Sequence, residues 1–232
     1  MRRAGYGEAM APETPVSKGL DHVVVDRSRI SWVGGTTGEL VYRGFEIDAL
    51  VPGVPYESAV HLLLHGDPPS ADPSPEVVAA LRAHRTPAPG VTRVVDALPA
   101  GLPPLEALRT ILSALGDGSF RYPPSLEEGF RLIAQTPVLL ARYVRRSRGD
   151  LPIEPDPDRT HAENYLRMIT GRPPDPAAAH ALESYLVLLA DHGMNASTFA
   201  LRVAISTQSD LASAATAALA TLKGPCTADA PA

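Results

Sequence analysis

The sequence is poor in the residues that cross-link extracellular domains. It has one cysteine, Cys226, so neither an intrachain disulfide nor a Cys-x-x-Cys metal site can form, and we predict a protein of the reducing cytoplasm. No apolar run reaches the length of about 18 residues that a membrane span needs. Residues 1–18 lack the apolar stretch of a signal peptide, and we expect them to form a disordered tail.

A block of basic residues is also missing. The net charge is −5, which argues against nucleic acid as a partner, although a few local arginines would suffice for a small anionic substrate. No P-loop or Gly-x-Gly-x-x-Gly element occurs. With 44% apolar and 20% charged residues, the composition is typical of a globular protein.

The patterns that are present predict a mainly α fold. Residues 22–33 alternate and are rich in β-branched residues, a glycine-rich turn follows at 34–38, and residues 40–42 are apolar again, which predicts a small N-terminal β-hairpin. Capping boxes at Ser125–Glu128 and Thr160–Glu163 mark two helix starts. The full set of predicted helices is 55–65, 74–85, 104–115, 125–148, 160–171, 175–192, 196–206 and 210–222.

His192 is the histidine best placed for chemistry. We expect it in the last turn of the helix that starts at Asp175, at the edge of an apolar face, where the negative helix end favours it. Asn195 is expected to cap the next helix. On position alone, His192 is either a functional residue or a helix-terminal histidine beside a capping asparagine.

Two other patterns have plain structural interpretations. His61 and His65 lie four apart, which is the spacing of paired metal ligands on one helical face. They lie among leucines with no obvious third ligand, so we interpret them as packing or surface histidines and predict no metal site. Ser197 near His192 suggests a hydrolase, but the Gly-x-Ser-x-Gly turn of such enzymes is absent.

Six segments of the chain form a recognisable series of motifs. The most specific is the nine-residue run DHGMNASTF at 191–199. The others are GLDHVVV at 19–25, GELVYRGFEI at 38–47, LLLHG at 62–66, LRT at 108–110 and LKGP at 222–225. In chain order they resemble bacterial citrate synthases and the related 2-methylcitrate synthases, and the resemblance is collinear over residues 19–225.

This resemblance implies the helical core of the family's large domain and a Claisen condensation. Acetyl-CoA would condense with oxaloacetate to give citrate and CoA, as in the tricarboxylic acid cycle, in a homodimer without a bound cofactor. The family removes the methyl proton with a carboxylate base and stabilises the enolate with a histidine. On the resemblance, His192 holds the keto acid and Asn195 borders the same pocket.

The sequence departs from the family pattern after Pro225. Where the family continues with Leu-His-Gly-Gly, this chain has Cys-Thr-Ala-Asp, so that Thr227 occupies the position of the catalytic histidine. We therefore assign no catalytic residue. If Cys226, Thr227 and Ala228 are encoded TGC-ACG-GCN, one more C in front of these bases gives Leu-His-Gly, and we hypothesise a one-base deletion at this point.

The departure leads to an expectation for the whole chain. We expect residues 19–225 to be an incomplete large domain and residues 226–232 an aberrant tail, with the small domain absent. A chain of this kind would be inactive alone. The alternative is a non-catalytic paralogue that dimerises with itself or with a full-length synthase.

Overall fold

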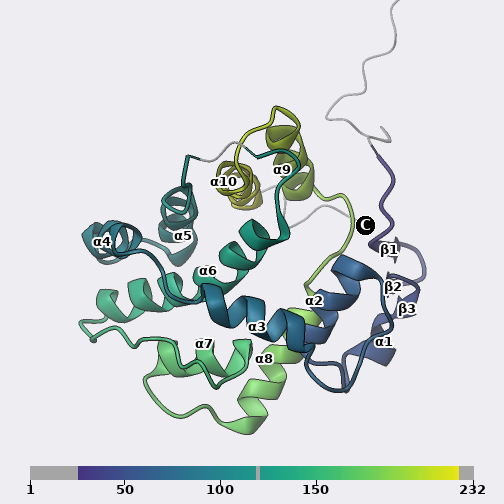
Figure 1. Ribbon diagram of the computed structural model, residues 1–232, viewed down its shortest axis with the longest axis horizontal. Helices are drawn as coiled ribbons and strands as arrows, with labels where there is room; N and C mark the ends of the chain where they lie inside the picture. The colour runs from purple at the N-terminus through teal and green to yellow at the C-terminus, as the bar shows by residue number, and fades with distance from the viewer. Residues whose placement is uncertain (1–25, 119–120, 225–232) are drawn as a thin grey trace, which may run out of the picture.

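The computed structural model describes residues 26–118 and 121–224, and most of these residues are helical (Figure 1). The strands are β1 Ser31–Gly34, β2 Glu39–Tyr42 and β3 Phe45–Glu46. The helices are α1 Ile47–Leu50, α2 Tyr56–His65, α3 Pro75–His84, α4 Pro89–Ala97, α5 Pro104–Ser113, α6 Leu126–Ser147, α7 His161–Thr170, α8 Pro176–Leu188, α9 Ala196–Ser206 and α10 Leu211–Leu222. The predicted mainly α fold is confirmed. None of the described helices is both long and apolar enough to cross a membrane.

The predicted hairpin is the first part of a three-stranded antiparallel sheet with the order β1-β2-β3. Ser31 pairs with Tyr42 at the open end of the hairpin. The tight turn between the strands closes on the Gly34 carbonyl, which accepts from the Gly38 amide at 2.7 Å. The two-residue strand β3 was not predicted because it is too short to show an alternating pattern. Of the predicted strand region 22–33, residues 22–25 lie outside the described residues, and residues 26–30 are not in a strand, so that part of the prediction is wrong.

Local capping chemistry sets most helix ends where the sequence predicts them. Both capping boxes are formed: Ser125 Oγ accepts from the Glu128 amide at 3.2 Å, and Glu128 Oε2 accepts from the Ser125 amide at 2.7 Å. Helix α2 ends on Gly66, whose φ of 84° lies in the left-handed region that glycine adopts without strain. The short helices α1 and α4 were missed, and α4 begins with Pro89-Gly90, which is typical of a turn.

Helix α8 begins at the predicted cap but ends at Leu188, so the prediction that it reaches His192 is wrong. The reason is the buried hydroxyl of Tyr42, which contacts the Val187 and Leu188 carbonyl oxygens, each at 3.0 Å. The Asp191 amide donates to this hydroxyl at 3.2 Å, where a continued helix would have it donate to Val187. His192 therefore lies in a loop.

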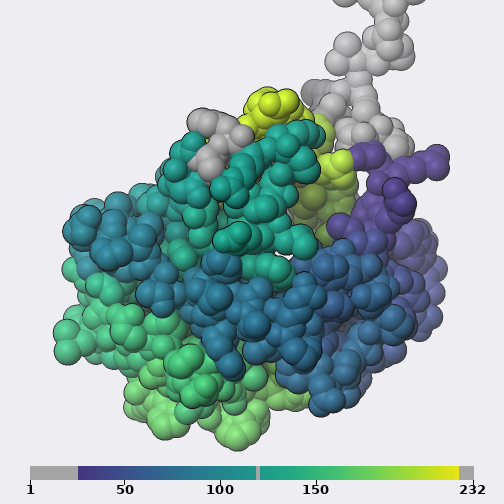
Figure 2. All heavy atoms as spheres, in the orientation of Figure 1, coloured from purple at the N-terminus to yellow at the C-terminus, as the bar shows by residue number. Residues whose placement is uncertain are grey.

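Two apolar clusters place the elements that matter for the site. The larger one joins α4, α5, α6 and α10, around Ile111 and Leu139. The second joins the sheet to α1, α2 and α8 through Tyr42, Leu62 and Val187. Figure 2 shows α2 and α3 (blue) lying between the sheet on one side and α4 on the other.

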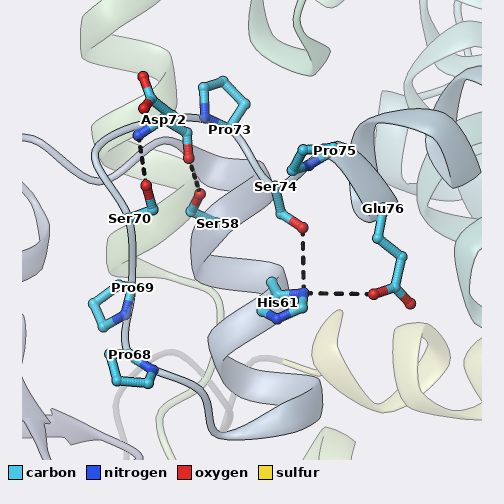
Figure 3. A pocket seen from close by; sticks show the side chains of 10 residues that line it. All are labelled: Ser58, His61, Pro68, Pro69, Ser70, Asp72, Pro73, Ser74, Pro75 and Glu76. Atoms are coloured by element: carbon cyan, nitrogen blue, oxygen red, sulfur yellow. Dashed lines mark hydrogen bonds and ion pairs between the residues drawn. The ribbon is translucent and has the colours of Figure 1, made fainter.

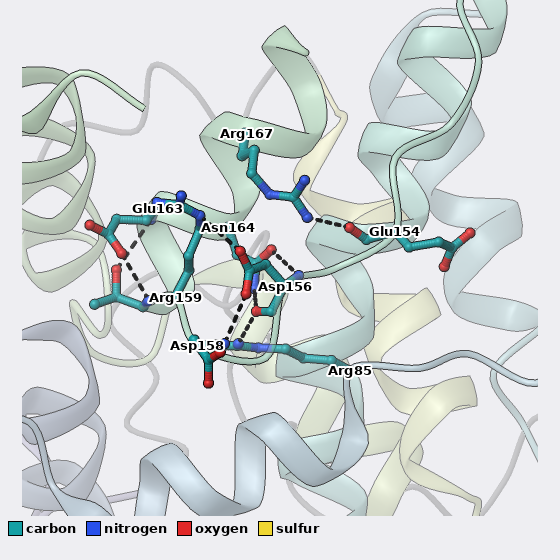
Figure 4. A network of polar contacts seen from close by, with 9 residues as sticks. Arg85, Glu154, Asp156, Asp158, Arg159, Glu163, Asn164 and Arg167 are labelled. Atoms are coloured by element: carbon teal, nitrogen blue, oxygen red, sulfur yellow. Dashed lines mark hydrogen bonds and ion pairs between the residues drawn. The ribbon is translucent and has the colours of Figure 1, made fainter. Parts of the chain in front are cut away.

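A polar network fixes the loop before α7 (Figure 4). The Asn164 side chain accepts from the Asp156 amide at 2.9 Å and donates to the Asp156 carbonyl. Arg85, at the end of α3, donates to the same carbonyl at 2.9 Å, and Arg159 donates to the Asp156 carboxylate at 3.1 Å. Because Arg85 and Asn164 are both buried, these bonds hold the start of α7 firmly against α3.

Candidate functional site

The loop between α8 and α9 carries the predicted site residues, and the small sheet holds it in place. Asp191 Oδ1 accepts from the Ser31 hydroxyl on β1 and from the Gly193 amide, the latter at 2.9 Å. Tyr42 on β2 bonds both the end of α8 and the Asp191 amide. Strands β1 and β2 therefore position a loop about 150 residues further along the chain.

The structure brings His192 and Asn195 into contact. Asn195 Oδ1 accepts from the Thr198 amide at 2.8 Å, so Asn195 is the N-cap of α9, as predicted. This bond fixes the amide orientation and leaves the Asn195 Nδ2 group beside His192 Nε2 at 3.0 Å. Because the amide is the donor in this contact, His192 Nε2 is the acceptor, and the hydrogen-bond geometry assigns the ring N–H to Nδ1.

This arrangement suits the binding of an anionic group. The His192 side chain is exposed, and its Nδ1–H is a hydrogen-bond donor. The loop precedes α9, an 11-residue helix whose N-terminal amides favour negative charge. Asp191 is the carboxylate of the loop, and its Oδ1 already accepts two hydrogen bonds that hold the loop.

The remaining sequence candidates fall in two places. His61 and His65 face the start of α3, where Glu76 lies within ion-pair distance of both. Sequence reasoning missed Glu76 because it lies on the following helix, after a proline-rich loop. Cys226 and Thr227 lie outside the described residues.

The model of the family described as "Citrate synthase, C-terminal domain" matches residues 19–232. The chain belongs to the citrate synthase family. Its mainly helical fold with a small sheet is the fold of solved citrate synthases, as the resemblance implied.

Named citrate synthase family members are similar along nearly all of this chain. A citrate synthase of Haloferax volcanii is 39% identical over 90% of this chain and 58% of its own length. The 2-methylcitrate synthase 2 of Corynebacterium glutamicum is 37% identical over 93% of this chain and 59% of its own. A ternary complex of the Thermoplasma acidophilum citrate synthase with carboxymethyl coenzyme A and oxaloacetate superposes with a TM-score of 0.82, at 25% identity, over 91% of this chain and 57% of that one. The chain thus spans less than two thirds of the length of these citrate synthase relatives.

Proposed function

We propose that this chain carries the oxaloacetate-holding part of an enzyme that condenses acetyl-CoA with oxaloacetate to citrate and CoA. In this reaction a base removes a methyl proton of acetyl-CoA, and the resulting enolate carbon forms a bond to the keto carbon of oxaloacetate. The keto oxygen takes up a proton, and water cleaves the thioester to release CoA. The enzyme is thus an acyltransferase in which the acyl group becomes an alkyl group.

The observation that carries this proposal is the His192–Asn195 contact at the start of α9. Oxaloacetate is a dianion whose keto oxygen gains negative charge as the new bond forms. A preoriented N–H donor of His192, set by an asparagine that α9 itself holds, stabilises such charge without reorganisation. Membership of the citrate synthase family and the oxaloacetate in the superposed relative's complex support the assignment.

We propose further that the 232-residue chain does not catalyse this condensation by itself. Removal of a methyl proton requires a free carboxylate base, and the loop carboxylate of Asp191 is bound to Ser31 and Gly193. A threonine at position 227 has no ring nitrogen with which to stabilise an enolate. Thiol release from acetyl-CoA in the presence of oxaloacetate should therefore stay at the uncatalysed rate.

Oxaloacetate binding tests the role of the pair. We expect the Asn195→Ser variant to bind oxaloacetate at least about tenfold more weakly in a calorimetric titration, because the amide that orients the His192 donor is lost and a bond from such a donor to a charged ligand is worth about 1.5–3 kcal/mol. Serine keeps an N-cap oxygen for α9, so the helix should remain stable. His192→Ala should lower the affinity by a similar or larger factor.

Asp210→Ser is the matched control, since Asp210 caps α10 in the same way through the Ser213 amide at 2.9 Å. Its affinity for oxaloacetate should equal that of the unaltered chain. Equal affinity in the Asn195, His192 and Asp210 variants, or no binding of oxaloacetate at all, would contradict the assigned role. Turnover by the unaltered chain would contradict the proposed inactivity.

We also propose that the chain forms a homodimer through a surface that includes α9. Seven of the 11 residues of α9 are apolar (ASTFALRVAIS), yet none of them is buried. Val203 is the most exposed large apolar residue of α9, at 49%. Apolar area of this kind marks association surfaces. Sedimentation velocity at tens of micromolar should give a dimer, which Val203→Glu weakens; a stable monomer is the opposing result.

A further inference from the structure

Two imidazoles and a carboxylate meet where the last turns of α2 face the first turn of α3. Glu76 Oε2 lies 3.9 Å from His61 Nδ1, and Glu76 Oε1 lies 3.7 Å from His65 Nε2. The two rings are 4.6 Å apart between their centroids. One ligand atom from each of the three residues lies within 4.8 Å of the others. We propose that His61, His65 and Glu76 bind a divalent transition-metal ion of the zinc type.

The donor set and its geometry fit such an ion. Two histidines and one carboxylate are a zinc ligand set that leaves a fourth position for water. Metal bonds of about 2.0–2.2 Å place tetrahedral donors about 3.3 Å apart. The Glu76 oxygens are already within 0.6 Å of that separation from both histidines, since the distances are 3.9 and 3.7 Å.

Asp67 supplies the outer contact that metal-bound histidines usually have. Its Oδ2 lies 3.3 Å from His61 Nε2, the ring nitrogen that does not face Glu76. A carboxylate in this position holds the Nε2–H tautomer and leaves the Nδ1 lone pair for the metal. Ser74 Oγ lies 3.2 Å from the same Nδ1, and its hydroxyl has to rotate away when the ion binds.

The surroundings leave the site accessible. The side chains of His61, His65 and Glu76 are 25%, 30% and 59% exposed, so an ion can enter from solvent. His61 and Glu76 also line a cavity of about 510 Å³, whose other lining residues come from the loop between the two helices, from Ser58 on α2 and from Pro75 at the start of α3 (Figure 3). The fourth coordination position therefore has room for water or a small ligand.

This site shares no residue with the His192–Asn195 loop. A bound ion would cross-link α2 to α3 and so restrict the conformations of the proline-rich loop that joins them. Because the ion binds the folded chain through three residues brought together by folding, it should raise the melting temperature, and the stabilisation should grow with the logarithm of 1 + [ion]/Kd.

The test uses the full 232-residue chain, purified without a histidine tag and freed of metal with a chelator. Co²⁺ and Zn²⁺ are then titrated, with Co²⁺ binding followed by its visible absorption and Zn²⁺ binding by competition with the bound Co²⁺. We expect one equivalent to bind. His65→Ala should weaken binding by more than about 100-fold, because losing a ligand costs more than losing an outer partner; Asp67→Asn should weaken it by about 10–100-fold.

His180→Ala is the matched control, since His180 is an exposed histidine on α8 and lies outside the group. Its affinity should be unchanged. Circular dichroism checks that each variant is folded, and the exposure of His65 makes its replacement tolerable. The proposal is overturned if His65→Ala, Glu76→Gln and His180→Ala bind with equal affinity, or if the folded chain binds no equivalent of either ion.

Discussion

Acidification should remove about 3 kcal/mol from the free energy of unfolding through one residue, His161. The pKa of this imidazole is lowered from 6.5 to about 4 by burial and, secondarily, by the positive charge of Arg85. Because the native pKa lies below the unfolded one, the unfolded chain takes up a proton first as the pH falls. The contribution of His161 to the free energy of unfolding is fully present above pH 6.5. It is lost as the pH falls from 6.5 to about 4, at about 1.4 kcal/mol per pH unit.

The structure explains why this histidine stays neutral. His161 is the first residue of α7, and its backbone amide donates to Glu57 Oε1 at 2.9 Å. Its ring packs against Tyr56, with 5.1 Å between the ring centroids, and only 8% of the residue is exposed. The bonds that tie Arg85 to the Asp156 carbonyl hold α3 against this helix start. An imidazolium at this position would lose its hydration with a cation nearby.

His161→Gln should remove most of this acid sensitivity. Urea unfolding at pH 7 and pH 5 measures this sensitivity. Between these two pH values, the free energy of unfolding of the unaltered chain should fall by about 2 kcal/mol more than that of the variant. His84→Gln, at a partly exposed histidine, is the control and should behave as the unaltered chain. Burial raises the pKa of Glu183, so this carboxyl adds to the free energy of unfolding as the pH falls. Its contribution is the same in every variant and cancels in the comparison. Equal pH dependence of the unaltered chain and His161→Gln would refute the assignment.

Leu62→Ala should lower the free energy of unfolding by about 2–5 kcal/mol, the usual cost of a cavity at a fully buried leucine. Leu62 is 0% exposed and packs in the cluster that joins the sheet to α1, α2 and α8. Leu64→Ala, on the same helix but 39% exposed, should cost less than about 1 kcal/mol.

Equilibrium unfolding in urea compares the two variants directly, since both remove the same atoms from the same helix. The difference between them isolates the packing of the cluster from the change in helix propensity. Equal decreases in the free energy of unfolding would mean that packing in this cluster does not stabilise α2. We expect Leu62→Ala also to loosen the loop of His192, because Tyr42 and Val187 belong to the same cluster.

The sequence predicts those parts of the fold whose causes are local. The capping boxes, the glycine end of α2 and the Asn195 cap all depend on residues within four positions, and each is confirmed. His192 and Asn195 are three positions apart, so their contact is local too. Motif resemblance predicted the family for the same reason, since the run at 191–199 is continuous.

Features with distant causes were missed. The end of α8 depends on Tyr42, 145 residues before Val187, and no pattern within the helix marks it. Glu76 joins His61 and His65 only because the loop after Gly66 turns α3 back along α2. The low pKa of His161 likewise depends on burial by residues of other helices.

The hydroxyl of Tyr42 makes the position of the loop between α8 and α9 sensitive to the pairing of the strands. Side chains of a strand alternate between faces, so a slip of one residue in the β1–β2 register would turn Tyr42 away from α8. The Val187 and Leu188 carbonyls and the Asp191 amide would then lose their shared partner in one step. The position of the His192 loop therefore depends on the register of two short strands at the other end of the described chain, and an error of one residue in that register would free the loop.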